Sequence, residues 1–218
     1  MILTTEEQAL TWLARLPEWN ALAEERLSLL ARMLCEENQR QNLIVAASME
    51  ALWLRHIADS AQLLLHVPSE SCSPWLDLGT GAGFPGLVVA ALRPDCRVVM
   101  VESRARRAEW LESARRAMGL VNAEVFDGRL EHLPSAKFCT VSARAFAPLS
   151  KLLDLSARFS TSDTCWLLPK GRSAAQELLS LSGWAHLFHV EQSLSDADAG
   201  VIVGILIGKT AAGRGKIS

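Results

Sequence analysis

Residues 75–86 read Trp-Leu-Asp-Leu-Gly-Thr-Gly-Ala-Gly-Phe-Pro-Gly, and this stretch is the most informative part of the chain. Its apolar start predicts a short buried strand, its glycines a tight loop, and Pro85 the first turn of a helix, where a missing N–H costs nothing. Glycine permits a positive φ and lets a ligand approach where a Cβ would collide. Glu102 closes the next apolar run, 97–101, where a carboxylate can accept hydrogen bonds from ribose hydroxyls. The stretch therefore predicts a site for a nucleotide-type ligand.

Two registers of these glycines compete, and each predicts a different cofactor. Gly81-x-Gly83-x-x-Gly86 is the dinucleotide fingerprint, which should open directly after an apolar strand. Asp77-x-Gly79-x-Gly81-x-Gly83 is similar to the first motif of class I S-adenosylmethionine (SAM) methyltransferases. The methyltransferase register fits better, because polar Asp77 and then Gly79 already interrupt the apolar run. The chain from this loop onward also has the length of one domain, which leaves no second catalytic domain for a dehydrogenase.

The composition is that of an ordinary soluble protein of 218 residues, 50% of them hydrophobic, with a formal net charge of −2. The longest apolar run, 200–208, is far shorter than the roughly 20 residues of a membrane span, and no secretory signal is visible. Five widely spaced cysteines without a CxxC pair indicate reduced thiols in a cytosolic protein, not a zinc site or a disulfide framework. The net charge argues against nonspecific coating of nucleic acid but leaves room for a local basic patch.

The chain divides into three predicted parts. Residues 1–70 form a helical extension. Residues 71–208 alternate strands and helices, which predicts a mostly parallel, seven-stranded sheet covered on both faces. Residues 209–218 form a basic tail that we expect to be flexible. The predicted N-caps of the three helices in the extension are Thr5, Asn20 and Ser48. The predicted strands are 75–79, 97–102, 123–126, 138–142, 164–168, 186–190 and 201–207, and the helices between them are 85–92, 104–118, 146–158 and 173–182.

The loops after the strands should line the site, because ligands of such sheets bind beyond the carboxyl ends of the strands. After the third strand, Leu130 and Glu131 can cover and hydrogen-bond an adenine. After the fourth, Arg144 has no acid nearby in sequence, which suits a SAM carboxylate or an RNA phosphate as its partner. After the fifth, Lys170 is a flexible point charge at the rim of the same cleft, although a plain surface charge explains it equally well.

Five arginines crowd the predicted helix 104–118. We favour pairing of this cluster with Glu109 and Glu112, which stand at three- and four-residue spacings. Arg106 and Arg107 remain candidate RNA contacts.

Several motifs together resemble the RsmG (GidB) family of bacterial small-subunit ribosomal RNA guanine-N7 methyltransferases. The motifs are Asn42-Leu43, Arg55-His56-Ile57-Ala58-Asp59-Ser60, residues 77–86, Arg129-Leu130-Glu131, Ser142-Ala143-Arg144-Ala145-Phe146 and Lys170-Gly171. The resemblance covers roughly residues 20–208. It implies an α/β fold of the class I SAM-dependent, Rossmann-like type, SAM as cofactor, and a guanine in 16S rRNA of the small ribosomal subunit as target. The predicted cofactor-binding residues are Gly79, Gly81, Gly83, Phe84, Glu102, Leu130, Glu131 and Arg144.

The sequence departs from the family pattern in three places. Glu102 stands where aspartate is frequent, which keeps a ribose contact but lengthens the arm. Arg106 and Arg107 stand where a lysine commonly precedes an arginine. Ala143 directly precedes Arg144, where Ser-Arg-Ala is usual.

Methylation at guanine N7 requires no general base, because this nitrogen carries an in-plane lone pair and no proton. We therefore assign no catalytic acid or base, and Arg144 is the candidate positioning residue. His56 and Asp59, one helical turn apart, could be taken for a catalytic dyad, but we prefer a structural role that orients their helix against the cofactor domain.

Two other functions stay open: a SAM-dependent methyltransferase of a protein or small molecule, and a nucleotide-sensing module without turnover. We expect a cytoplasmic monomer that binds neither a metal nor a membrane.

Overall fold

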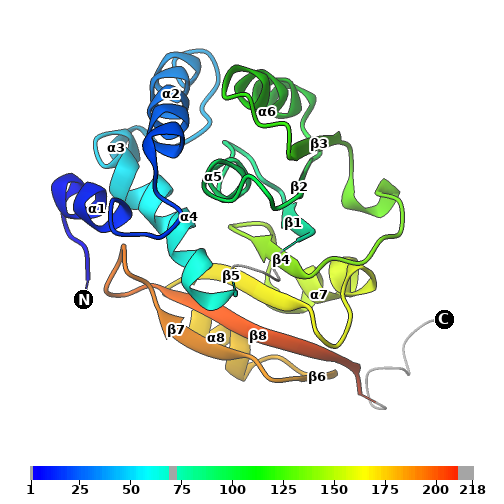
Figure 1. Ribbon diagram of the computed structural model, residues 1–218. Coiled ribbons are helices and arrows are strands. Elements are labelled where there is room, and N and C mark those ends of the chain that lie inside the picture. The colour runs from blue at the N-terminus through cyan, green and yellow to red at the C-terminus, as the bar shows by residue number, and fades with distance from the viewer. Residues whose placement is uncertain (1, 69–72, 211–218) are drawn as a thin grey trace.

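The computed structural model describes residues 2–68 and 73–210, and its centre is one sheet with helices on both faces (Figure 1). The strands are β1 (Trp75–Leu78), β2 (Val98–Glu102), β3 (Ala123–Asp127), β4 (Thr140–Ala143), β5 (Cys165–Gly171), β6 (Trp184–His186), β7 (His189–Gln192) and β8 (Gly200–Lys209). Their order is β3-β2-β1-β4-β5-β8-β6, with β7 also paired to β8. Strands β1 to β5 are parallel, and β8 runs antiparallel to β5, β6 and β7.

The helices of the extension are α1 (Glu6–Leu13), α2 (Ala21–Glu37), α3 (Ala46–Met49), the π-helix η1 (Trp53–Ala58), α4 (Asp59–Ala61) and the 3₁₀-helix η2 (Gln62–His66). Those of the sheet domain are α5 (Gly86–Leu92), α6 (Ala105–Ala117), η3 (Leu130–His132), α7 (Leu149–Ser156), η4 (Ala157–Phe159) and α8 (Ala174–Leu179). None of the helices in the described ranges is both long and apolar enough to cross a bilayer.

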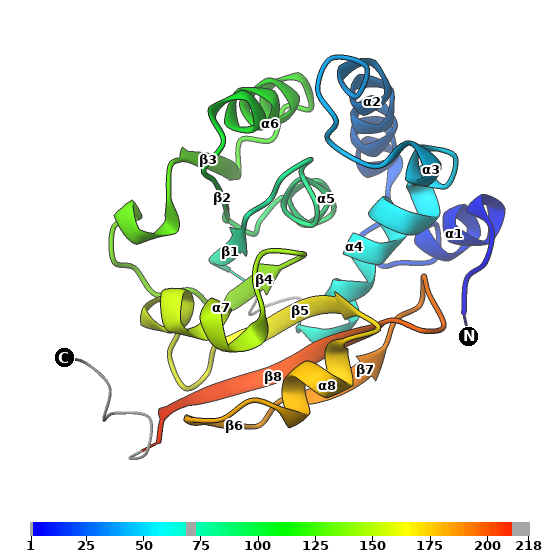
Figure 2. The ribbon, with the colours of Figure 1, turned by 180° about the vertical axis from the view of Figure 1, so that it is seen from behind.

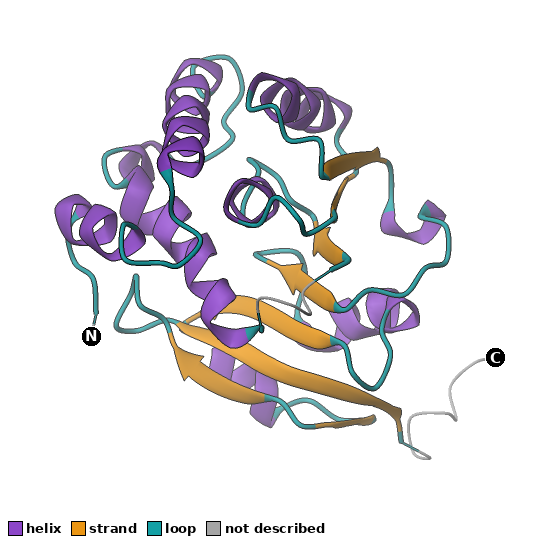
Figure 3. Ribbon diagram, viewed as in Figure 1, coloured by secondary structure: helices purple, strands orange, loops and turns teal. Residues whose placement is uncertain are grey.

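Alternate residues of the strands supply two separate cores, one on each face. Trp75 and Met100 join α5, α6 and the extension, whereas Leu76 and Val101 join α7 and α8. Figure 3 shows the strands as one layer between helices, and Figure 2 shows α7 and α8 from the other side. The extension packs through α2 and α4 onto α5, so it shares a core with the sheet.

Two of the predicted caps are present, and the third is wrong. Thr5 accepts a hydrogen bond from the Gln8 N–H and Asn20 accepts one from the Ala23 N–H. Ser48 instead lies inside α3 and donates to the Val45 carbonyl. The start of η1 is capped by the Glu6 carboxylate of α1, which accepts from the N–H groups of residues 53 and 54 at 3.2 and 2.7 Å. A cap that arrives from another helix leaves no local sequence signal.

The sheet has eight strands in the described residues, where the sequence predicted seven. The predicted strand 186–190 is split into β6 and β7, and both pair with the ten residues of β8. Because both pieces follow the same partner, the pattern of side chains does not reveal the break. Lys209, the first residue of the predicted tail, is the last residue of β8, and residues 211–218 of that tail fall outside the described residues.

The predicted helix 146–158 starts three residues late, at Leu149, and residues 144–148 form a loop after β4. The non-glycine residue Ala145 in this loop has φ 53°, a left-handed conformation that costs roughly 1 kcal/mol or more. The first N–H of α7 is satisfied by the Glu177 carboxylate at 2.8 Å. The loop therefore has a fixed shape before the helix begins.

A buried carboxylate joins β1, β4 and α5. Asp77 accepts hydrogen bonds from the Gly86 N–H at 3.0 Å and from the Ser142 hydroxyl at 2.7 Å, and Ser142 in turn accepts from the Trp75 indole at 2.8 Å. Burial raises the pKa of Asp77 to about 6, despite these donors and nearby Arg144. Asp77 thus fixes both ends of the glycine loop, and its negative charge is costly.

This raised pKa predicts a pH-dependent stability. The folded state binds the proton of Asp77 more tightly than the unfolded chain, so the stability from this group is full below its ordinary value of 3.8 and is lost as pH rises through about 6. Asp77→Asn removes this dependence. Urea unfolding from pH 4.5 to 7.5 should show wild type losing stability relative to the variant, on the order of 3 kcal/mol over the full titration. Parallel stability curves would contradict the assignment.

Candidate cofactor site and adjoining cavity

The loop between β1 and α5 lies at the carboxyl edge of the parallel strands. Gly79 and Gly81 both have positive φ, at 65° and 61°. A Cβ on Gly79 would lie 2.6 Å from the Phe146 ring, so this position excludes any larger residue. A Cβ on Gly81 would meet nothing closer than Arg107 Nη1 at 3.6 Å. Gly81 itself is buried, whereas Gly79 is partly exposed and lines a cavity, so the loop leaves room for a close approach at Gly79.

Glu102 ties the end of β2 to this loop. Its side chain is buried, with Oε2 accepting from the Gly81 N–H at 3.0 Å and Oε1 from the Arg104 N–H at 2.9 Å. A carboxylate can accept about four hydrogen bonds, so acceptor capacity remains for a ligand hydroxyl. The residues present fit the ribose of a nucleoside cofactor.

A cavity of about 230 Å³ continues from Gly79. Val101 and Leu130 supply apolar surface, and Glu131 with Arg129, 3.0 Å apart, supplies a polar rim. This combination suits a purine, which has flat apolar faces and a polar edge. The sequence placed Leu130 and Glu131 at such a position, and the structure brings them beside the glycine loop.

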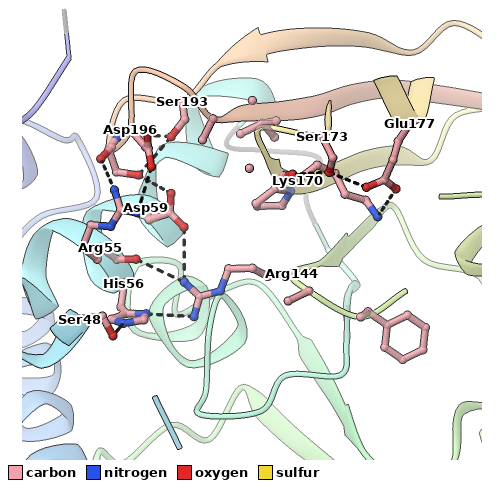
Figure 4. A pocket seen from close by; sticks show the side chains of 18 of the residues that line it. Ser48, Arg55, His56, Asp59, Arg144, Lys170, Ser173, Glu177, Ser193 and Asp196 are labelled. Carbon is pink, nitrogen blue, oxygen red and sulfur yellow. Dashed lines mark hydrogen bonds and ion pairs between the residues drawn. The ribbon is translucent and has the colours of Figure 1, made fainter. Parts of the chain in front are cut away.

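A larger cavity, of about 740 Å³, lies on the other side of the loop after β4 (Figure 4). Its walls come from η1, α4, the loop after β4, the end of β5 and the turn before β8. Phe146 and Ala147 line both cavities. The loop 144–148 therefore forms a wall between them.

Arg144 is held at this wall by residues of the extension (Figure 4). Its guanidinium lies 5.1 Å from the centre of the Phe84 ring and donates to His56 Nδ1 at 3.1 Å and Asp59 Oδ2 at 3.4 Å. The His56 ring stacks on Phe84 as well, at 5.0 Å and 26°. Arg144 has no acid nearby in sequence, and the fold supplies Asp59 from 85 residues away.

His56 is neutral in this arrangement. Burial first, then the charges of Arg144 and Arg55, lower the pKa of His56 to about 3. Nδ1 accepts from Arg144, so the ring proton is on Nε2 and donates to the Ser48 hydroxyl at 2.9 Å. The contacts agree with a structural role for His56 and Asp59, and the residue they orient is Arg144.

Sequence reasoning missed a polar cluster at the turn before β8. Asp59 Oδ1 accepts from the hydroxyl of Ser195 at 2.5 Å, and Arg55 pairs with Asp196 at 3.0 Å. No motif marks residues 195 and 196. They become part of the cavity only because β7 and the turn after it return the chain to the extension.

The structure changes the expected positions of two candidate RNA contacts. The side chain of Lys170 is 8% exposed and pairs with Glu177 at 2.9 Å, so it is not the flexible charge at the rim that the sequence predicted. Arg107 lies beside Gly81 and not further out. Arg106 is exposed and borders a different cleft, of about 330 Å³ between α2 and α6.

Helix α6 pairs only part of its arginine cluster internally. Glu112 binds Arg115 at 2.7 Å and Arg116 at 2.5 Å. The other predicted acid, Glu109, makes no ion pair among the described side chains. Within the ranges that the structure describes, no group of three or more His, Cys, Asp or Glu side chains could hold a metal ion.

Comparison with known proteins identifies the family. The family model described as rRNA small subunit methyltransferase G (GidB) matches residues 23–195. Proteins named ribosomal RNA small subunit methyltransferase G from Novosphingobium aromaticivorans and Erythrobacter litoralis are 52% and 53% identical over 95% and 93% of this chain, and over 91% and 97% of their own lengths.

Solved structures confirm the predicted fold class. The O-methyltransferase TomG from Streptomyces achromogenes in complex with SAM superposes with a TM-score of 0.56 at 15% identity, over 93% of this chain and 96% of that one. The cofactor-bound protein Rv0187 from MTB gives a TM-score of 0.59 at 14% identity, over 94% and 99%. At these identities the likeness establishes the class I methyltransferase fold alone.

The geometry around His56 yields a prediction for its titration. Replacing Arg144 with glutamine removes a positive charge from beside the ring, so the pKa of His56 should rise from about 3 while burial still keeps it below 6.5. Long-range ¹H–¹⁵N spectra of the imidazoles should show wild-type His56 neutral and protonated on Nε2 from pH 5 to 8, with His56→Asn assigning the signals. An ordinary titration near pH 6.5 in the wild type would contradict this environment.

Proposed function

Because this chain belongs to the rRNA small subunit methyltransferase G family, we propose that it transfers a methyl group from SAM to N7 of a guanine in 16S rRNA of the small ribosomal subunit. The observation that carries the proposal is the partly exposed Gly79, which lines the smaller cavity, in a loop that the buried Glu102 holds at Gly81, since this arrangement suits a nucleoside cofactor. A cytoplasmic location follows from a ribosomal substrate, and the monomeric state stays a prediction.

The cofactor is SAM, and its proposed binding residues fall into two groups. Gly79, Gly81 and Gly83 form the loop that the cofactor approaches, and Glu102 accepts from its ribose. Leu130 and Glu131 then enclose the adenine in the smaller cavity. The guanidinium of Arg107 lies beside Gly81. We therefore propose that Arg107 belongs with the glycine loop and Glu102 as a cofactor contact, in place of its predicted contact with RNA.

When bound, SAM supplies an electrophilic methyl group on a sulfonium. The larger cavity suits an acceptor that needs no base, because each carboxylate lining it is paired with a cation. These pairs are Asp59 with Arg144, Glu177 with Lys170, and Asp196 with Arg55, at 3.4, 2.9 and 3.0 Å. His56 cannot act as a free base either, since Nδ1 is occupied by Arg144. Guanine N7 needs only alignment and exclusion of water.

Arg144 is the proposed positioning residue of the reaction. It lies at the wall between the two cavities, and Phe84, His56 and Asp59 hold its guanidinium in one place. An arginine so fixed can orient a guanine or the carboxylate of the cofactor without reorganising. Arg106, exposed on α6, remains the proposed phosphate contact.

The function is tested by mapping modified bases in rRNA. A strain from which the coding sequence is deleted should lack one N7-methylguanosine in small-subunit rRNA, and restoring the sequence should restore it. Mass spectrometry of nuclease digests reads this directly. Unchanged rRNA in the deletion strain, with retained SAM binding by the purified protein, would point to a protein or small molecule as the substrate, or to a sensor.

Gly81→Val tests the cofactor loop. A valine at φ 61° strains the loop, and its Cβ would contact Arg107 Nη1 at 3.6 Å, so the surface that the cofactor contacts should change and the affinity for S-adenosylhomocysteine should fall at least tenfold, about 1.4 kcal/mol. Gly119→Val is the matched control, because Gly119 has φ 62° and lies in the turn after α6. The affinities are measured by calorimetry. Equal affinities of the two variants for S-adenosylhomocysteine would show that the cofactor binds elsewhere.

Arg144→Ala tests positioning against simple charge attraction. Turnover at saturating RNA should fall by roughly ten- to a hundredfold, because a small misplacement of the reacting groups costs that much. Arg106→Ala should instead lower RNA affinity and flatten its salt dependence, with full turnover at saturation. Single-turnover methylation across a salt series separates the two effects. If Arg144→Ala kept normal turnover at saturating RNA, Arg144 would only attract RNA and would not position the reacting groups.

A further inference from the structure

Lys170 and Glu177 form a largely buried ion pair at the end of β5 and on α8 (Figure 4). Their atoms Nζ and Oε2 lie 2.9 Å apart, and the side chains are 8% and 24% exposed. Such pairs rarely add net stability, because the desolvation of two charges offsets their attraction. An apolar pair of similar size would serve the packing equally well, so the position of these charges needs another explanation.

The pair clasps the loop after β4 on both sides of Pro148. Lys170 Nζ donates to the Ala147 carbonyl at 2.6 Å, and Glu177 Oε2 accepts from the Leu149 N–H at 2.8 Å. The Ser173 hydroxyl lies 2.8 Å from Glu177 Oε1 and can donate to it. One ion pair therefore holds a carbonyl and an amide of the same short segment, which sets the exit of the loop.

The other end of the loop is fixed by a second ion pair, between Arg144 and Asp59. Between the two anchors lie Ala145, in its left-handed conformation, and Phe146, whose ring lies over Gly79. A strained residue persists only where its surroundings determine it. With both ends held, the ring of Phe146 has a defined place at the wall between the two cavities.

We propose that Lys170 and Glu177 are a positioning pair, which holds the loop 144–149 so that Phe146 and Arg144 stand correctly between the cofactor loop and the acceptor cavity. The inference rests on the proposed function for its effect on catalysis. It replaces the interpretation of Lys170 as an RNA contact, because its ammonium is directed to Ala147 and Glu177 and not to solvent.

Two single variants, each of which removes one charge of the pair, distinguish positioning from attraction of RNA. Lys170→Met and Glu177→Gln should both lower turnover at saturating RNA and SAM, by about tenfold or more, and leave the salt dependence of RNA affinity unchanged. If Lys170 contacted phosphates, its loss would weaken RNA binding and flatten the salt dependence, whereas removing the acid Glu177 would strengthen binding. Opposite effects of the two variants on RNA affinity would overturn the proposal.

A double variant separates positioning from folding. Lys170→Met combined with Glu177→Leu removes the cost of burying two charges, which offsets the loss of partners for the Ala147 carbonyl and the Leu149 N–H, so stability should stay close to that of the wild type. Its turnover should nevertheless stay as low as that of the single variants, because nothing then holds Ala147 and Leu149. A double variant that is stable and fully active would show that the pair serves packing alone.

Hydrogen exchange of the loop gives a readout that does not depend on the substrate. The Leu149 amide should exchange at least tenfold faster in Lys170→Met and in the double variant, with the strands β1 and β2 unchanged. Lys209→Met is the matched control, because it removes a lysine from the exposed pair with Asp154. Unaltered exchange at Leu149 would contradict the proposal that Lys170 and Glu177 hold the loop 144–149. Wild-type protein that leaves rRNA unmethylated would contradict only the proposed function.

Discussion

Two buried carboxylates hold the glycine loop, and the rest of the site depends on them. Asp77 accepts from the Gly86 N–H at the start of α5, and Glu102 accepts from the Gly81 N–H in the middle of the loop. Each carboxylate accepts from a backbone N–H of the loop, which fixes the loop while Gly79 lines the smaller cavity. A rigid glycine backbone beside a carboxylate with spare acceptor capacity is what a nucleoside cofactor requires.

The helical extension completes the second half of the site. The π-helix η1 and α4 bring His56 and Asp59 to Arg144, and Phe84 of the glycine loop lies against both His56 and Arg144. π-helical turns often occur at functional sites, since the extra residue redirects a side chain. Because the extension also shares a core with α5, the cofactor loop and the acceptor cavity are parts of one packed unit.

Local patterns predicted the candidate residues at the carboxyl ends of the parallel strands. The glycine loop follows β1, Glu102 ends β2 and Leu130 comes after β3, and strands of this kind share one carboxyl edge. Contacts between distant residues were not predictable in this way. Glu6 caps η1, Asp59 pairs with Arg144, and Glu177 pairs with Lys170. No local sequence signal marks any of these partners. Lys170 was therefore interpreted as a free cation, although the fold buries it.

We propose that the cofactor lies along the glycine loop and the acceptor lies across Phe146 in the larger cavity. A crystal structure of the protein with S-adenosylhomocysteine tests this arrangement. The ribose hydroxyls should lie within hydrogen-bond distance of Glu102 and the adenine between Leu130 and Glu131, on the smaller cavity's side of the loop 144–148. A nucleoside bound instead beside Arg144 and His56, in the larger cavity, would contradict it.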